Sequence, residues 1–271
     1  MAMAEPEDAE LWDDTAEAAL PGPMSQGLRF FGDMPHTVRV EPARRSWGSI
    51  DVLDAYRLPE SDLVRASPLV VLGDIAMGIP PAYTFRPHAA ITVDLDHRTL
   101  RATTASRLRF EARVVKQGRR LAVCDCTFRE ASGAIVAYST ATFIGAPRPD
   151  GDDQPPPASY RCTGAMHKPF PEQLGVRVVE AGVVELDRTT YVRQITDTIQ
   201  GGAMALIAEV ATESLLGRPI VDIALRYLSA VREGPARATA AVLDDRHARV
   251  EIVDTARTDG ALATVAVVRT I

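Results

Sequence analysis

The chain has 271 residues, of which 46% are hydrophobic and 24% charged, and its formal net charge is −6. This composition is ordinary for a globular protein of one or two domains, and the acidic balance, with no run of four Lys or Arg, argues against nucleic acid as a main partner. No apolar run approaches the roughly 18 residues of a membrane span, and the N-terminus lacks the regions of a signal peptide. We therefore expect a cytoplasmic protein without a membrane partner.

The first segment of the chain is acidic. Residues 1–28 contain seven acids and neither Lys nor Arg. Such a segment has little apolar surface to bury, so we expect a mobile leader with room for one short helix.

Residues 29–145 are predicted to form a first α+β unit. An irregular or strand-like stretch over 37–58 precedes an apolar segment of helical length over 68–79. Ser67 and Pro68 predict the start of that helix, as an N-cap followed by proline at the first helical position. Three or four strands are expected after the helix.

A linker and a second unit follow. The segment 146–172 is rich in Pro, Gly and Asp, which predicts a partly extended linker. Residues 173–271 then repeat the order of the first unit, with a strand-like stretch over 176–198 and an apolar helix over 202–216.

Strands and hairpins are expected at matching places in both units. Polar and apolar residues alternate over 108–114 and 248–252, as in half-buried strands. Turn residues predict the hairpins of the two units at 116–119, 132–133, 244–247 and 259–260.

The two units resemble each other in sequence. Residues 112–144 and 240–271 follow the same pattern, with Gly133 aligned to Gly260. A repeat of this length indicates two copies of one structural unit. One helix followed by an antiparallel meander places each copy in the α+β class.

Each predicted helix carries one acid at the matching position. Asp74 is the only ionisable residue of 69–79, and Glu209 is the only one of 203–211. A carboxylate on a helix that is apolar all round is costly to desolvate unless it is paired, and burial raises its pKa. We interpret these acids as ligand-facing or catalytic, with a buried structural tie as the alternative.

The spacing around the second helix resembles the PaaI-like family of hotdog-fold acyl-CoA thioesterases. Gln194 is followed six residues later by Gln200-Gly201-Gly202, and Glu209 lies eight residues after Gly201. The resemblance covers residues 37–145 and 173–271, and in the first unit it is carried by Leu72-Gly73-Asp74-Ile75-Ala76, Thr92-Val93-Asp94 and Val115-Lys116-Gln117-Gly118-Arg119.

The resemblance implies two hotdog units in tandem, each with a long helix wrapped by an antiparallel sheet, paired as a pseudo-dimer. It implies hydrolysis of acyl-CoA or related thioesters, with coenzyme A entering only as part of the substrate and no other cofactor or metal. Such fused pairs often assemble further, so a homo-oligomer is also expected. Two departures stand out: Gln200 replaces the family's His, and the first unit has Pro59 and Ala66 where the amide and the first glycine are expected.

The catalytic groups are expected to come from both units. Eight residues of helix separate Gly201 from Glu209 by about 12 Å, too far to serve one carbonyl. Two antiparallel helices side by side would instead place Asp74 next to Gly201, with Gln194 as a second donor. The family's hydroxyl that supports the acid corresponds to Thr92, whereas the second unit has Ile220. The site that contains Glu209 is therefore expected to be degraded.

The remaining candidates have a functional and a structural interpretation. Gln200 and Gly202 are expected to contact substrate beside Gly201. Lys116 and Arg119 contact coenzyme A phosphates in one interpretation and form a solvated turn in the other. We expect Glu213 to face solvent, all five histidines to occupy surface or loop positions, and Cys124 and Cys126 to be buried hydrophobic residues.

Two other functions compete with thioester hydrolysis. A hotdog pair can bind an acyl thioester or a partner protein without turnover, and the missing His favours that alternative. Hotdog hydratases and dehydratases usually place a His beside the acid, and neither predicted helix contains one.

Overall fold

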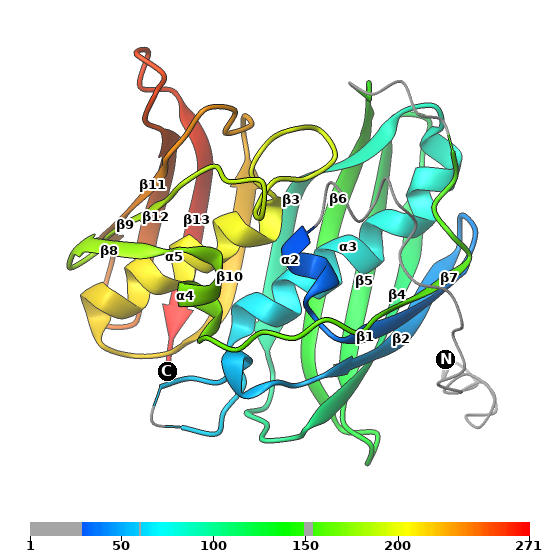
Figure 1. The fold of residues 1–271 in the computed structure, drawn as a ribbon, viewed down its shortest axis with the longest axis horizontal. Coiled ribbons are helices and arrows are strands. Elements are labelled where there is room, and N and C mark those ends of the chain that lie inside the picture. The colour runs from blue at the N-terminus through cyan, green and yellow to red at the C-terminus, as the bar shows by residue number, and fades with distance from the viewer. Residues whose placement is uncertain (1–28, 60, 149–153) are drawn as a thin grey trace.

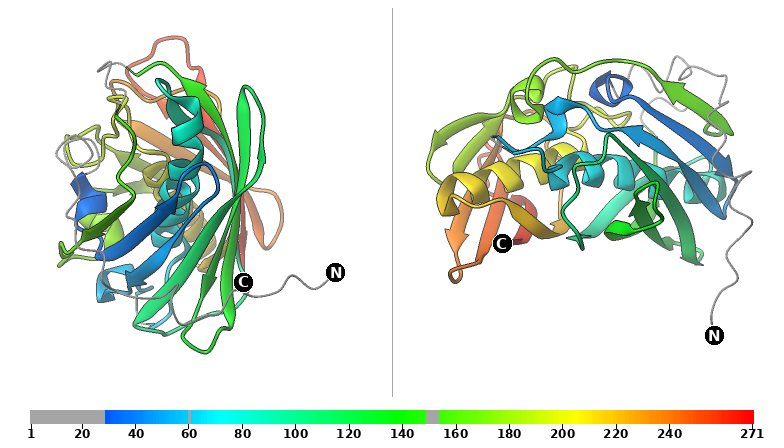
Figure 2. Two further views of the ribbon diagram at one scale, coloured as in Figure 1. Left: turned by 90° about the vertical axis from the view of Figure 1, so that its right-hand side faces the viewer. Right: turned by 90° about the horizontal axis from the view of Figure 1, so that it is seen from below.

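The computed structural model describes residues 29–59, 61–148 and 154–271, so the acidic leader predicted over 1–28 lies outside the described residues. One antiparallel sheet of 13 strands curves around two long helices, α3 (Ala66–Phe85) and α5 (Gly201–Leu216), which lie on the same face of the sheet (Figures 1 and 2). The shorter helical segments are α2 (Arg29–Gly32), η1 (Asp54–Tyr56) and α4 (Phe170–Leu174).

Apart from the additional edge strand β7, the two halves of the sheet have the same strand order, counted outwards from the centre. Along the sheet the strands run β7-β1-β2-β4-β5-β6-β3-β10-β13-β12-β11-β9-β8. In the centre β3 pairs with β10, and Asp96 lies opposite Ala224. The strand bounds in the first half are β1 (His36–Glu41), β2 (Arg45–Asp51), β3 (Ala89–Thr99), β4 (Arg107–Gln117), β5 (Leu121–Arg129), β6 (Ile135–Ala146) and β7 (Ser159–Cys162). In the second half they are β8 (Arg177–Glu180), β9 (Val183–Leu186), β10 (Ile220–Tyr227), β11 (Ala236–Val242), β12 (His247–Asp254) and β13 (Leu262–Thr270).

The hairpins lie where turn residues predicted them. Gly133, between β5 and β6, and Gly260, between β12 and β13, have positive φ angles of 85° and 61°. Glycine adopts this left-handed conformation without the steric cost of a Cβ atom.

Helix α3 is longer than the sequence indicated. The predicted segment 68–79 stopped before Pro80 and Pro81, yet the helix continues to Phe85. Pro80 has no N–H to donate to the carbonyl of Ala76, and the hydroxyl of Ser46 on β2 donates to that carbonyl instead, with 2.7 Å between the oxygens. This tertiary contact offsets part of the cost of the prolines.

The start of α3 also differs from the prediction. The helix begins at Ala66, its N-cap is Arg65, and Ser67 lies inside the first turn. The prediction of Ser67 as N-cap was therefore wrong. By length and composition α3 could cross a membrane, but 72% of its most apolar stretch is buried within the structure, as in the core helix of a soluble protein.

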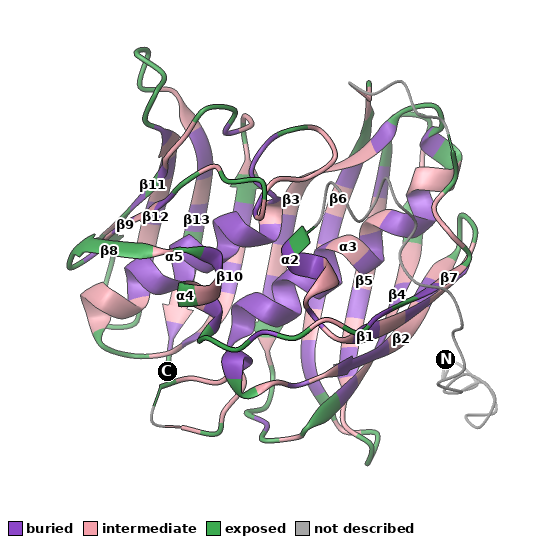
Figure 3. Cartoon of the chain, viewed as in Figure 1, coloured by how far each residue is buried: buried purple, intermediate pink, exposed green. Residues whose placement is uncertain are grey.

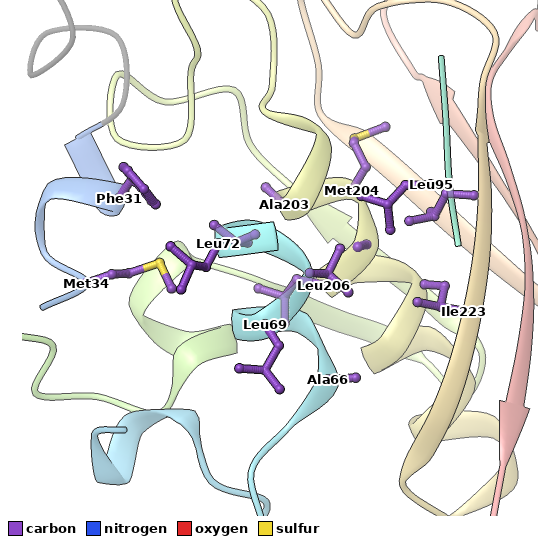
Figure 4. Close-up of a cluster of buried hydrophobic side chains, with 14 of the residues drawn as sticks. Phe31, Met34, Ala66, Leu69, Leu72, Leu95, Ala203, Met204, Leu206 and Ile223 are labelled. Atoms are coloured by element: carbon purple, nitrogen blue, oxygen red, sulfur yellow. The ribbon is translucent and has the colours of Figure 1, made fainter. Parts of the chain in front are cut away.

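The two helices pack closely where α5 begins. Leu69 and Leu72 of α3 face Ala203 and Leu206 of α5, and both helices are buried along most of their length (Figures 3 and 4). A Cβ atom on Gly202 would lie 2.5 Å from Val71 Cγ2, so only glycine fits this crossing without movement. Gly202 is thus explained by helix packing.

The segment predicted as a linker contains regular structure. Strand β7 pairs with β1 at the edge of the sheet, and α4 begins at Phe170. The prolines of this segment lie outside the strand, so they do not prevent its pairing.

The burial of two histidines contradicts one prediction, and the burial of two cysteines confirms another. His36 and His97 are 3% and 0% exposed, so the expectation of surface or loop positions is wrong for these two histidines. Burial lowers the pKa of both side chains, to about 4 and about 3, so they are neutral near pH 7. Cys124 and Cys126 are free and fully buried, as the sequence predicted.

Candidate active site

The two acids occupy the same position on their helices. Asp74 is the eighth residue after the first residue of α3, and Glu209 is the eighth after the first residue of α5. Because the helices lie side by side, Asp74 reaches the start of α5: its Oδ2 would lie 3.3 Å from a Cβ atom on Gly201. The structure therefore brings Asp74 and Gly201 together across the two halves of the chain.

Asp74 is held by two hydrogen bonds. Thr92 on β3 donates its hydroxyl to Oδ1 at 2.6 Å, and Gln200 donates its side-chain amide to Oδ2 at 3.1 Å. The carboxylate is 6% exposed, and burial raises its pKa to about 6, although both hydrogen bonds act in the opposite direction. A carboxylate with this pKa is ionised near neutral pH and is still basic enough to accept a proton.

Gly201 presents a backbone N–H at the start of α5. Gln200 is the N-cap, and its side-chain oxygen accepts from the N–H of Ala203 at 3.1 Å. This cap leaves the N–H of Gly201 without an acceptor among the described residues. An unpaired N–H at a helix N-terminus carries partial positive charge and binds anions or polarised carbonyl oxygens.

Tyr227, at the end of β10, completes the centre of the site. Its hydroxyl donates to the carbonyl oxygen of Gly201 at 3.0 Å, and the same hydroxyl would lie 3.2 Å from a Cβ atom on Gly201. Burial and the nearby charge of Asp74 raise the pKa of the phenol well above its usual value, so Tyr227 stays protonated.

These residues open into a cavity of about 670 Å³. Its walls are largely apolar and come from α3, the start of α5, the β3 and β6 strands, and the loop before α5, which is drawn in yellow-green above that helix in Figure 1. Asp74, Thr92 and Gly201 all line it. A mainly apolar cavity with a few convergent polar groups is typical of a small-molecule site.

The other predicted site residues are distributed around this centre. Gln194 lines the cavity, and its amide donates to the hydroxyl of Thr198 at 2.7 Å. Gln200 also lines it, whereas Gly202 is buried against Val71. Lys116 and Arg119 are exposed near the β4–β5 turn and do not line the cavity.

The second acid has a different environment. Glu209 accepts a hydrogen bond from the backbone N–H of Ala66 at 3.2 Å and another from the hydroxyl of Ser67. Arg65, which is 4% exposed, contacts Glu209 at 3.5 Å and also pairs with Glu213. Glu213 therefore does not face solvent as predicted, and its pKa is raised to about 8, chiefly by burial.

The roles of Arg65 and Tyr227 were not predicted from the sequence. Arg65 occupies the position before α3 that Gln200 occupies before α5, so comparing the residues before the two helices could have found it. No motif marks Tyr227, whose role depends on where β10 ends. Among the residues that the structure describes, no group of three or more His, Cys, Asp or Glu is placed to hold a metal ion.

Comparison with known proteins identifies the architecture. No protein-family model matches the chain, and no curated protein matches it in sequence. Among solved structures, it is similar to an acyl-ACP thioesterase from Bacteroides thetaiotaomicron, with a TM-score of 0.61 and 9% identity over 84% of this chain and 98% of that one. It is also similar to the 12:0-ACP thioesterase from Umbellularia californica, with a TM-score of 0.58 and 12% identity over 85% and 98% of the two chains. At these identities the likeness shows the fold alone, which is that of hotdog-type thioesterases.

Proposed function

We propose that this protein hydrolyses acyl thioesters, with acyl-CoA esters as its substrates, at a single site between its two halves. The observation that carries the proposal is the buried carboxylate of Asp74 beside the unpaired N–H of Gly201, inside an apolar cavity. Thioester hydrolysis needs such a pair, a donor for the carbonyl oxygen and a base or nucleophile for the carbonyl carbon. The fold it shares with thioesterases supports the same conclusion.

In this proposal the chain is a fused pair of hotdog units of the PaaI-like type. The matching strand order of the two halves and the central pairing of β3 with β10 support it. The active site then needs both units, because the acid comes from α3 and the N–H from α5.

The proposed reaction begins when the thioester carbonyl oxygen accepts a hydrogen bond from the Gly201 N–H. Asp74 then either removes a proton from a water molecule that attacks the carbonyl carbon or attacks that carbon itself. In the first route the tetrahedral intermediate collapses, expels the thiolate and leaves the free acid, and the proton held by Asp74 returns to the thiolate. In the second route the attack expels the thiolate and forms a mixed anhydride with Asp74. A water molecule then hydrolyses the anhydride, which releases the free acid and regenerates the Asp74 carboxylate, and a proton of that water goes to the thiolate.

The neighbouring side chains position the acid. Thr92 and Gln200 each hold one oxygen of Asp74, so the carboxylate keeps one orientation relative to α5. Tyr227 bonds to the Gly201 carbonyl and fixes the first turn of α5. Gln194, further along the cavity wall, has a second amide hydrogen that can orient substrate.

A thiol-release assay with short, long and aromatic acyl-CoAs tests the proposal. We expect turnover of at least one class by the wild-type protein and loss of that turnover in Asp74→Asn, which controls for contaminating esterases. Binding of acyl-CoA without thiol release in every class would contradict hydrolysis and favour a non-catalytic binding protein.

A further inference from the structure

The loop before α5 ends at a residue that holds Asp74. Residues 187–200, between β9 and α5, form turns and one isolated bridge between Arg193 and Ile199. The last of them is Gln200, the N-cap of α5, and we call this segment the α5 loop. Because its backbone is irregular, the position of Gln200 depends on the contacts that the α5 loop makes with the rest of the chain.

Tyr191 joins the α5 loop to the first half of the chain. Its phenol donates to Asp33 Oδ2 at 2.7 Å and accepts from the side-chain amide of Gln173 at 3.2 Å. Its carbonyl oxygen accepts from the N–H of Phe30 at 3.3 Å, and the two rings meet edge to face with 6.2 Å between their centres. Burial and the hydrogen bond to Asp33 raise the pKa of the phenol, so Tyr191 stays protonated and can donate.

The segment that supplies Phe30 and Asp33 is itself fixed. Phe31 of α2 and the nearby Met34 are buried and belong to the same hydrophobic cluster as Leu72 of α3 (Figure 4). A Cβ atom on Gly164 would lie 2.5 Å from Asp33 Cα, so the chain after β7 passes directly against this segment. The α5 loop is therefore attached through Tyr191 to a firmly packed part of the first half.

A short series of hydrogen bonds leads from Tyr191 to Asp74. The N–H of Gln200 donates to the carbonyl oxygen of Val192, the residue after Tyr191, at 3.0 Å. The Gln200 side chain bonds in two directions, because its Oε1 accepts from the N–H of Ala203 and its Nε2 donates to Asp74 Oδ2, each at 3.1 Å. A displacement of Tyr191 and Val192 therefore moves the group that holds one oxygen of the acid.

The α5 loop also has contacts within the second half. Ile199 donates its N–H to the carbonyl oxygen of Val231 at 3.1 Å, and the side chain of Arg188 pairs with Asp197 at 2.6 Å. These contacts remain when the bond between Tyr191 and Asp33 is removed. We therefore expect that removal to displace Gln200 without unfolding the loop.

We propose that Tyr191 is a positioning residue, which acts through Val192 and Gln200 to hold the carboxylate of Asp74 beside the first turn of α5. Asp33 and the α2 backbone anchor Tyr191 from the first half. The inference rests on the proposed thioester hydrolysis and adds a role in it for a contact outside the cavity.

Removal of single groups from this contact tests the proposal. Tyr191→Phe removes the phenol oxygen and keeps the ring beside Phe30, and Asp33→Ala removes the acceptor. Asp33→Asn keeps a side-chain oxygen that can accept from Tyr191, so it is the rescue variant. Tyr138→Phe is the matched control, because Tyr138 also donates to an acid, Asp125, at 3.4 Å and lies on β6 outside the cavity lining.

We expect Tyr191→Phe and Asp33→Ala to lower kcat for acyl-CoA by about 10-fold, less than the roughly 10²-fold that a displacement of about 1 Å can cause. KM should change little, because the cavity walls stay the same. The hydrogen bond from Gln200 lowers the pKa of Asp74, so its weakening should move the acid limb of the pH–rate profile to higher pH. Asp33→Asn and Tyr138→Phe should keep the kcat and the acid limb of the wild type.

Two results of these assays would overturn the assignment. One is a lower unfolding temperature in Tyr191→Phe with unchanged kcat and acid limb, which would show a purely structural contact. The other is an equal loss of kcat in Asp33→Asn and Asp33→Ala, because only the first keeps an acceptor for the phenol.

The route through Gln200 has its own test. If Tyr191 acts through Gln200, Tyr191→Phe should change kcat by less than about two-fold in a Gln200→Ala background, since effects along one network are not additive. A further loss of about 10-fold in that background would show independent effects and overturn the route.

A measurement without turnover separates this inference from the proposed function. If the wild-type protein releases no thiol, the proposed function fails, but the carboxyl carbon of Asp74 can still be titrated by NMR, with Asp74→Asn to assign its signal. We expect the pKa of Asp74 to be higher in Tyr191→Phe than in the wild type. Equal pKa values in the two proteins would overturn the positioning role of Tyr191.

Discussion

The backbone N–H of Ala66 donates to the carboxylate of Glu209, with 3.2 Å between the nitrogen and Oε1. Gly201 holds the same position at the start of the other helix, but its N–H has no acceptor within the described part of the chain. The facing acid, Asp74, is one methylene shorter than Glu209, and Thr92 and Gln200 hold its two oxygens. The N–H at the start of α3 is thus bonded to the facing acid, Glu209, whereas the N–H at the start of α5 remains available to a ligand.

Lengthening the acid should close the open site. In Asp74→Glu the carboxylate keeps its charge, but the added methylene lets it reach the Gly201 N–H, as Glu209 reaches Ala66. We expect kcat for thiol release to fall by about 10²–10³-fold, the usual effect of losing one oxyanion donor. Activity close to that of the wild type in a folded Asp74→Glu protein would show that the Gly201 N–H need not be free.

The acid limb of the pH–rate profile should follow the ionisation of the Asp74 carboxyl group. The carboxylate must be ionised to act as a base or nucleophile, and burial raises its pKa to about 6, so kcat/KM should fall as the pH decreases through about 6. Thr92→Val removes a hydrogen bond that lowers this pKa, so the limb should move to higher pH. A limb near pH 4, or a shift to lower pH in Thr92→Val, would contradict this assignment.

Asp74 should also make stability depend on pH. Because its pKa is raised in the folded state, the folded protein binds the proton more tightly than the unfolded chain does. Stability therefore decreases by roughly 3 kcal/mol as the pH rises from 3.8 to about 6. In urea unfolding, the decrease in stability from pH 4 to pH 7 should be smaller in Asp74→Asn than in the wild type by about this amount. The same pH dependence in both proteins would mean that Asp74 is not desolvated.

The adjacent glycines should respond differently to alanine. In Gly202→Ala the new Cβ atom would meet Val71 Cγ2 at 2.5 Å and Val71 Cα at 2.8 Å, so we expect a loss of about 1–3 kcal/mol in unfolding free energy. In Gly201→Ala the Cβ atom would lie 3.2 Å from the Tyr227 hydroxyl and 3.3 Å from Asp74 Oδ2. This variant should keep most of its stability and lose activity. Equal effects of the two variants on stability and activity would argue against separate roles.

The sequence predicted the parts of the site that follow from spacing along a helix. Asp74 and Gly201 could be paired because Gly201 and Glu209, eight residues apart on one helix, are too far apart to serve one carbonyl, which left the acid of the other helix as the partner. Thr92 followed from the resemblance on the next strand. The roles of Arg65 and Tyr227 could not be predicted this way, because they depend on how segments distant in sequence pack together.

The same limit applies to the fold. Alternation and turn residues indicated most strands and hairpins, since those signals are local. The extension of α3 through Pro80 and Pro81 depends on Ser46, a residue of a separate strand, and the strand β7 depends on pairing with β1. Neither contact can be predicted from the residues next to it in the sequence.

The most direct test compares the two acids in one thiol-release assay. Asp74→Asn should lower kcat by about 10²–10⁴-fold, the usual contribution of a positioned base. Glu209→Gln should keep kcat within a few-fold of the wild type while lowering the unfolding temperature, because it removes the counter-charge that Glu209 provides to the buried Arg65. Equal, small losses of kcat in both variants would contradict a single active site formed by Asp74 and Gly201.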